Sequence, residues 1–233
     1  MINDTTLPLI FLGSNANIYK LYELCQNVGY TIAGIIDDDY FDQEQFQGIP
    51  IINSESDLQN KVDFFRNTYQ FICATNWIPG PEFVRNREKR HRLINTLDRL
   101  NLSLATVISP QAQVSKHAAI GDGVFVDAFA TVEPNTKISN HCSMYSNSYL
   151  GHNSTLGRNT VVQRYCFITS DVLVGNNGYL GLYSQLSRSH VNIKDNTFIH
   201  PGITILRSTE ENEEVSLIGK DLRKVYHNVI IEE

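Results

Sequence analysis

One histidine of this chain, His152, is a candidate for acid–base chemistry. His152 lies in the segment Tyr149-Leu-Gly-His152-Asn-Ser-Thr-Leu-Gly157, at an outward polar position. A neutral imidazole accepts a proton near pH 7, so an exposed histidine suits a general base. The chain contains seven histidines, and a solvated side chain with no catalytic role is the alternative interpretation.

Further polar residues follow three apolar segments in the first hundred residues of the chain. Where such a segment is a strand that leads into a helix, the N–H groups at the helix start stabilise anions. Acidic side chains at the end of the next strand typically contact the ribose or base of a nucleotide. These residues are candidates for nucleotide binding, and the acidic run 37–39 also suits a plain turn. The candidates are Gly13, Ser14, Asn15, Asp37, Asp38, Thr75 and Asn76.

A basic cluster lies at the start of a predicted helix at 81–100. Its positive charge suits the diphosphate of a nucleotide, and a solvated helix face is the more common structure for such a cluster. The cluster consists of Arg85, Arg87, Lys89, Arg90 and Arg92.

The second half of the chain must place His152, and its pattern is a repeat of six. Fourteen aliphatic residues recur at this interval, one inserted residue shifts the phase, and the repeat resumes at Ile193, Ile199 and Ile205. Neither an α-helix nor an ordinary strand has this period. A parallel β-helix does, because three short faces form one triangular coil and each face needs one inward aliphatic residue. The fourteen are Ile108, Val114, Ile120, Val126, Val132, Ile138, Met144, Leu150, Leu156, Val162, Ile168, Val174, Leu180 and Leu186.

The residues before this repeat follow a different pattern, in which apolar strands alternate with helices. Such alternation predicts an α/β domain with a parallel sheet of four or five strands. We therefore expect an α/β domain at 1–106 and a β-helix domain at 107–233, whose charged tail after Arg207 is less regular. Strands are predicted at 8–13, 31–36 and 71–74, and helices at 16–28, 55–65 and 81–100.

Composition excludes several functional classes. The net charge of −6 and the pI of about 5.6 argue against a nucleic-acid or anionic-membrane surface. No apolar run approaches the roughly 20 residues that span a bilayer, and the N-terminus lacks the features of a signal peptide. The four cysteines have no metal-ligand or disulfide spacing. We expect a protein of the reducing cytoplasm that binds neither nucleic acid nor membrane.

A Rossmann-like domain fused to a hexapeptide β-helix that carries His152 resembles the sugar O- and N-acyltransferases of the NeuD and PglD type. The resemblance implies a left-handed β-helix and a homotrimer. It also implies a nucleotide-linked amino sugar bound partly by the N-terminal domain, with acetyl-CoA in the groove between neighbouring β-helices. His152 would be the general base for direct attack of the sugar amine on the thioester.

The resemblance assigns further residues and also shows differences. Asn153 stands where the family has an acidic residue that orients the histidine, and Val161 stands where it has a second histidine. The glycine-rich loop of the family is reduced to Gly13. The nucleotide-sugar site would comprise the candidates named above. The acyl-CoA site would include Ser170, Gly181 and His200.

Two alternatives remain open at this point. The acceptor is a sugar hydroxyl, as in O-acetylation of sialic acid, or the protein is a trimeric scaffold without activity. Another family with a left-handed β-helix, the γ-class carbonic anhydrases, binds zinc through three histidines between subunits. His117, His141 and His152 do not reproduce that spacing, so we expect no metal. We interpret His141 and His190 as structural.

Overall fold

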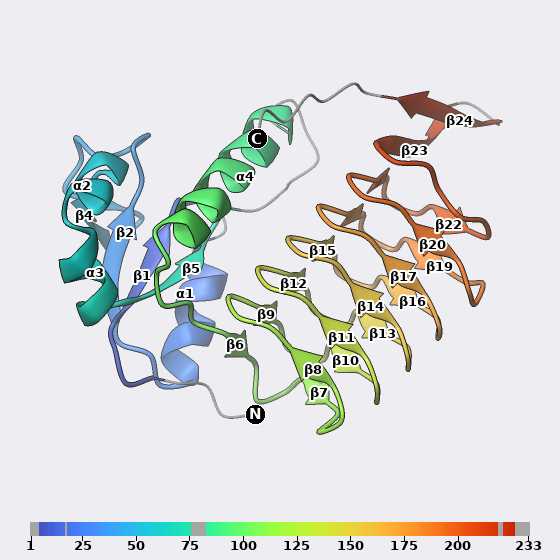
Figure 1. Cartoon of the computed structure of the whole chain (residues 1–233), viewed down its shortest axis with the longest axis horizontal. Helices are drawn as coiled ribbons and strands as arrows, with labels where there is room; N and C mark the ends of the chain where they lie inside the picture. Colours follow the sequence, from blue (N-terminus) through green and yellow to red (C-terminus); the bar gives the residue numbers. More distant parts are fainter. Residues whose placement is uncertain (1–4, 17, 76–82, 219–220, 227–233) are drawn as a thin grey trace. The chain divides into compact units, whose positions relative to one another are not determined.

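The computed structural model describes residues 5–16, 18–75, 83–218 and 221–226, so the candidate Asn76 lies outside the described residues. The chain divides into two compact units, Met1–Val107 and Ile108–Glu233 (Figure 1). Each unit is built on its own pattern of side chains and is described separately. No helix of the described residues is long and apolar enough to cross a membrane.

The first unit contains a five-stranded sheet in the order β3-β4-β2-β1-β5. Strand β3 pairs antiparallel with β4, and the other pairs are parallel. Every residue of β1 is buried, as expected for a central parallel strand whose two faces are both covered. The strands are β1 (Leu9–Leu12), β2 (Ile32–Ile36), β3 (Gln45–Phe46), β4 (Ile49–Asn53) and β5 (Gln70–Cys73). The helices are α1 (Ile18–Asn27), α2 (Glu55–Asn60), α3 (Val62–Thr68) and α4 (Phe83–Arg99).

This unit differs from the sequence-based expectation in two places. Strands β3 and β4 were not predicted, because Pro50 inside β4 has no N–H to donate and marks a segment as a poor strand. The structure tolerates Pro50 opposite Gln45 of the short edge strand β3. The predicted helix at 55–65 is two helices, since the backbone of Lys61 leaves the helical conformation between them. A Rossmann-like relationship remains a prediction.

The second unit is a parallel β-helix of three sheets, and its repeated short strands fit a left-handed β-helix. One sheet comprises β7 (Gln113–Val114), β10 (Thr131–Val132), β13 (Tyr149–Leu150), β16 (Phe167–Ile168), β19 (Gln185–Leu186) and β22 (Thr204–Ile205). The next comprises β8 (Ala119–Ile120), β11 (Lys137–Ile138), β14 (Thr155–Leu156), β17 (Leu173–Val174) and β20 (Asn192–Ile193). The third comprises β6 (Val107–Ile108), β9 (Phe125–Val126), β12 (Ser143–Met144), β15 (Val161–Val162), β18 (Tyr179–Leu180) and β21 (Phe198–Ile199), and continues into the tail.

The register of the strands shows why the sequence repeats every six residues. Leu150 pairs with Ile168 on the next coil, eighteen residues on, so one coil consists of three repeats. Val174 pairs with Ile193, nineteen residues on, which accommodates the inserted residue. The repeating aliphatic residues fill one continuous core, with Ile108, Val114 and Ile120 less buried at its first coil. The predicted β-helix is confirmed.

The corners of the coils require a left-handed backbone, which Asn adopts more readily than most residues. Asn159, Asn177, Asn196 and Asn212 all have φ between 56° and 58°. Their side-chain amides form a ladder along one corner, with N···O distances of 3.0, 3.0 and 2.9 Å. Asn at this corner therefore adopts the required backbone conformation and also gives each side-chain amide a hydrogen-bond partner.

Replacing Asn177 with Ala is expected to lower the free energy of unfolding by roughly 2–4 kcal/mol. Two hydrogen bonds of the side-chain amide are lost, and Ala is strained at positive φ. Asn147 is the control, since its φ is 59° but its side chain has no ladder bond. Asn147→Ala isolates the backbone cost of about 1–2 kcal/mol. Urea unfolding measures both variants, and equal losses would show that the ladder contributes nothing.

The charged tail is more regular than expected. Strand β23 (Glu213–Ile218) pairs in parallel with β21, and β24 (Asp221–Tyr226) pairs antiparallel with β23. The carboxylate of Glu213 is buried and forms an ion pair with Arg207, while Glu214 pairs with His200. The expectation of an irregular tail was wrong for its described residues, because β23 extends the sheet of β21 and β24 pairs with β23.

Candidate active site

His152 lies on an exposed corner of the β-helix, directly after β13. Its Nδ1 lies 2.8 Å from the Oγ of Ser170, which is eighteen residues on and therefore one coil along. Within the described part of the chain, Nε2 makes no hydrogen bond. The hydroxyl of Ser170 thus orients the ring and leaves its second nitrogen accessible.

The side chain of Asn153 hydrogen-bonds to other residues of its corner and not to the imidazole. It has a φ of 58°, and its Nδ2 donates to Asp171 at 3.0 Å. Its Oδ1 accepts from Asn135 at 3.4 Å. The side chain therefore belongs to a polar column along the corner. The orienting contact expected from residue 153 comes from Ser170 instead.

Aromatic and acidic side chains lie on the coil face before His152. The rings of Tyr149 and Phe167 stack with centroids 4.9 Å apart, and Phe167 is 42% exposed. The hydroxyl of Tyr149 hydrogen-bonds to Glu133, and burial together with this carboxylate raises the pKa of Tyr149. Sequence reasoning missed these residues, although a coil of eighteen residues places 149 and 167 in register and 133 two residues beyond Thr131, the partner of Tyr149.

The structure does not bring the three predicted acyl-CoA residues together. Ser170 contacts His152, while Gly181 and His200 lie at another corner, after β18 and β21. A Cβ on Gly181 would lie 2.5 Å from the backbone nitrogen of Pro201. Close packing of the coils therefore accounts for Gly181, and His200 is paired with Glu214.

The other histidines near this edge are separated by the coil geometry. His141 is buried at a corner after β11, away from the corner of His152. His190 is exposed, and its backbone N–H donates to the carbonyl of Asp171 at 3.0 Å, so it continues the column of Asn153. Among the described residues, no group of three or more His, Cys, Asp or Glu side chains is arranged to hold a metal ion.

In the first unit, the loop after β1 is a buried network. Gly13 has a φ of 77°, and a Cβ there would lie 2.6 Å from both Leu93 and Thr75. Ser14 donates to the carboxylate of Asp37 at 2.5 Å, and Lys89 pairs with the same carboxylate at 2.6 Å. Asp37 is fully buried. Asp37 thus joins the ends of β1 and β2 to α4.

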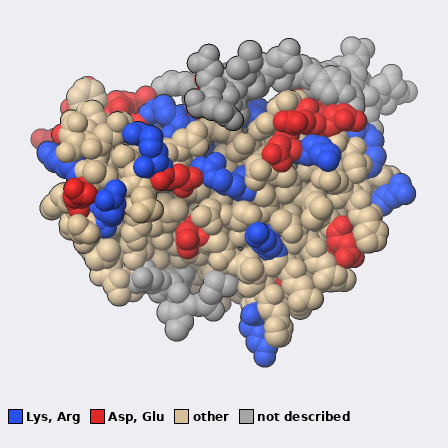
Figure 2. All heavy atoms as spheres, in the orientation of Figure 1, with Lys and Arg blue, Asp and Glu red and all other residues tan. Residues whose placement is uncertain are grey.

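The basic cluster is largely paired inside this unit. Burial alone lowers the pKa of Lys89, but hydrogen bonds to Asp37 and Asp39 outweigh it, so the net pKa is raised. Arg90 is buried and donates to the carbonyl of Thr75 at 2.7 Å, and Arg92 pairs with Glu55. In Figure 2, Lys and Arg are interspersed with Asp and Glu on the visible face. These three basic residues therefore serve the fold.

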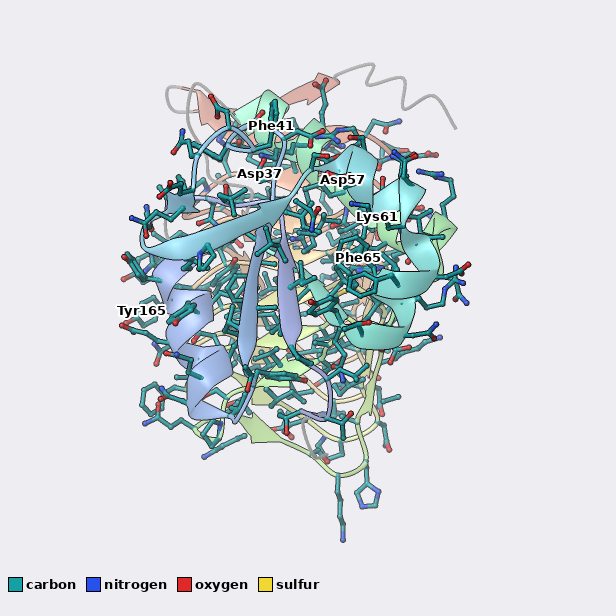
Figure 3. The ribbon with its side chains drawn as sticks, turned by 90° about the vertical axis from the view of Figure 1, so that its left-hand side faces the viewer. Asp37, Phe41, Asp57, Lys61, Phe65 and Tyr165 are labelled. Carbon is teal, nitrogen blue, oxygen red and sulfur yellow. The ribbon has the colours of Figure 1, made fainter. Side chains whose placement is uncertain are left out.

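A cavity of about 480 Å³ lies where β2 and β4 end and α2 begins. Figure 3 shows Phe41 and Asp57 toward the same end of the sheet, and Phe41 is 63% exposed. The Oδ1 of Asp38 accepts the N–H of Glu55 at 2.7 Å, which fixes its carboxylate at the rim. The lining consists of Asp38, Phe41, Ile51, Ile52, Asn53, Ser54, Ser56 and Asp57.

Of the predicted nucleotide-binding residues that the structure describes, only Asp38 lines this cavity. Ser14 and Thr75 are buried, and the amide of Asn15 donates to the carbonyl of Ala74. The prediction missed the side of the cavity formed by β4 and α2, because β4 was not predicted. The sequence signal that was present is Ser54, which caps α2 by accepting from Asp57 N–H.

No protein-family model and no curated protein matches this sequence. Solved structures do match over nearly the whole chain. A mutant perosamine N-acetyltransferase from Caulobacter crescentus, in complex with CoA and GDP-perosamine, is 18% identical, with a TM-score of 0.80 over 95% of this chain and 98% of that one. The acetyltransferase domain of PglB from Neisseria gonorrhoeae is 19% identical, with a TM-score of 0.77 over 94% and 99%. WeeI from Acinetobacter baumannii is 16% identical, with 0.76 over 94% and 100%. At these identities the likeness establishes a shared fold.

Proposed function

We propose that this protein is an acyl-CoA-dependent N-acyltransferase, with acetyl-CoA as its cosubstrate and the amine of a nucleotide-linked amino deoxysugar as acceptor. The observation that carries the proposal is the exposed imidazole of His152, held through Nδ1 by Ser170. The shared fold supports it, because solved structures of this fold include complexes with CoA and GDP-perosamine and with acetyl-CoA.

The proposed reaction is a direct transfer. The reaction uses the tautomer in which Nδ1–H donates to the Oγ of Ser170. In that tautomer Nε2 carries a lone pair and accepts a proton from the amine as its nitrogen attacks the thioester carbonyl. The C–N bond forms and the C–S bond breaks, and the departing thiolate takes the proton from the imidazolium. A backbone N–H of a neighbouring coil stabilises the oxyanion. Both substrates must be bound together, so sequential kinetics are expected.

We place the nucleotide at the cavity of the first unit. The rim carboxylate of Asp38 accepts hydrogen bonds from a ribose or a base, and the exposed ring of Phe41 offers a surface for stacking. The acyl donor would lie in a groove between subunits of a homotrimer, on the Ser170 side of His152. Gly181 and His200 have packing and pairing roles in the structure, so we do not include them in this groove.

Replacing Ser170 with Ala is expected to lower kcat about 3- to 10-fold, since one hydrogen bond to the base is lost. The KM values for both substrates should stay within twofold. Ser187→Ala, which removes another exposed hydroxyl from the same edge, is the control. If Ser170 contacts acyl-CoA instead, the KM for acetyl-CoA will rise while kcat stays constant.

Ligand-induced thermal shift tests the proposal without an activity assay. CoA and one nucleotide amino sugar should each raise the Tm, because a ligand that binds the native state stabilises it. The alternative is a trimeric scaffold, which buried Val161 favours at the position where the resemblance places a second histidine. A scaffold would respond to neither ligand. A response to hydroxyl sugars alone would favour O-acylation.

A further inference from the structure

Glu133 lies one coil before the catalytic corner. Its N–H donates to the carbonyl of Leu150 at 3.0 Å, so residue 133 is in register with Gly151, the neighbour of His152. Glycine at 151 places no side chain between Glu133 and the coil of His152. The carboxylate therefore lies on the same edge of the β-helix as the exposed imidazole.

The surroundings of Glu133 hold its side chain without neutralising it. The hydroxyl of Tyr149 hydrogen-bonds to it, and Tyr149 is braced by its stack with Phe167. Within the described residues, no Lys or Arg forms an ion pair with Glu133. Elsewhere in the chain, carboxylates such as Glu213 are paired with a cation. A carboxylate without an ion-pair partner, on the same edge of the β-helix as an accessible base, is suited to bind a cation.

We propose that Glu133 binds the ammonium form of the acceptor amine beside His152 and so selects amino sugars over hydroxyl sugars. This inference rests on the proposed function. An amine of this kind is largely protonated at neutral pH, and its charge and three N–H donors match a carboxylate, whereas a hydroxyl offers one uncharged donor. The bound ammonium releases one proton to water, and the neutral amine then reacts through His152 as described above.

The variant Glu133→Gln tests this inference, because it keeps the size of the side chain and removes its charge. The KM for the amino sugar should rise about tenfold or more, since charge-assisted hydrogen bonds are the strong ones. The kcat should stay within about threefold, and the KM for acetyl-CoA should not change. The matching hydroxyl sugar, used as a competitive inhibitor, should bind both proteins equally.

Glu211→Gln is the control, since Glu211 is an exposed carboxylate of the tail. An unchanged KM for the amino sugar in Glu133→Gln, with an active parent protein, would overturn the inference. An equal loss of affinity for the hydroxyl sugar would also overturn it, because the effect would then be independent of charge. A parent protein that is inactive on every amino sugar would instead overturn the proposed function.

Discussion

Replacing His152 with Ala is expected to lower kcat by about 10²–10⁴-fold, the range typical for loss of a general base. The KM for acetyl-CoA and for the nucleotide sugar should change little, because the imidazole accepts the proton of the amine and does not bind the nucleotide or CoA. His152 is exposed, and within the described residues its side chain is hydrogen-bonded only through Nδ1, so the substitution should leave the β-helix intact. Steady-state kinetics with acetyl-CoA measures the effect.

His117→Ala is the matched control for this variant. His117 is exposed and lies two coils earlier on the same edge, where its carbonyl accepts from Asn135. Its loss should leave kcat within twofold. Turnover of His152→Ala at the rate of the parent protein would show that another group accepts the proton. His190, which continues the same corner, would then be the next residue to replace.

Replacing Lys89 with Met is expected to lower the free energy of unfolding of the first unit by about 3–5 kcal/mol. The Nζ of Lys89 lies 2.6 Å from Asp37, and their side chains are 10% and 0% exposed. Removing one partner of a buried ion pair leaves the other charge without compensation. Hydrogen exchange of the amides in β1 and β2 measures the loss for this unit separately from the β-helix.

Lys61→Met is the matched control. Lys61 pairs with Asp57 at 3.4 Å, but these side chains are 59% and 42% exposed, so the pair should contribute little. Because the pKa of Lys89 is raised, the stability from its pair is present below the ordinary lysine pKa. It is lost as the pH rises through the raised value. Equal losses in the two variants would contradict a buried role for Lys89.

The β-helix could be predicted from the sequence because its structural rule is local. Each coil places one aliphatic inward every six residues, so the column from Ile108 to Leu186 appears directly as a repeat. The phase shift before Ile193 was visible for the same reason. The corner conformation of Asn177 follows the same period. A repeat of this kind needs no knowledge of long-range packing.

The missing parts depend on contacts that the sequence does not display. Asp37 is at the end of an apolar strand, where a carboxylate can either bind a ligand or pair with a buried cation of the protein. The sequence does not distinguish these two roles. Only the packing of α4 places Lys89 against it. Ser170 likewise contacts His152 because a coil has eighteen residues, whereas the family comparison directed attention to the adjacent Asn153. Pro50 made the segment of β4 a poor strand candidate, so one wall of the cavity was not predicted.

The most direct test of the central claim is thiol release from acetyl-CoA with a panel of nucleotide sugars. The panel contains UDP-, dTDP- and GDP-linked 3-amino and 4-amino deoxysugars, each beside the matching hydroxyl sugar. We predict turnover on at least one amino sugar, none on its hydroxyl counterpart, and identification of the nucleotide in the same experiment. No thiol release with any sugar of the panel, together with no thermal shift by CoA, would contradict the account and favour a scaffold without activity.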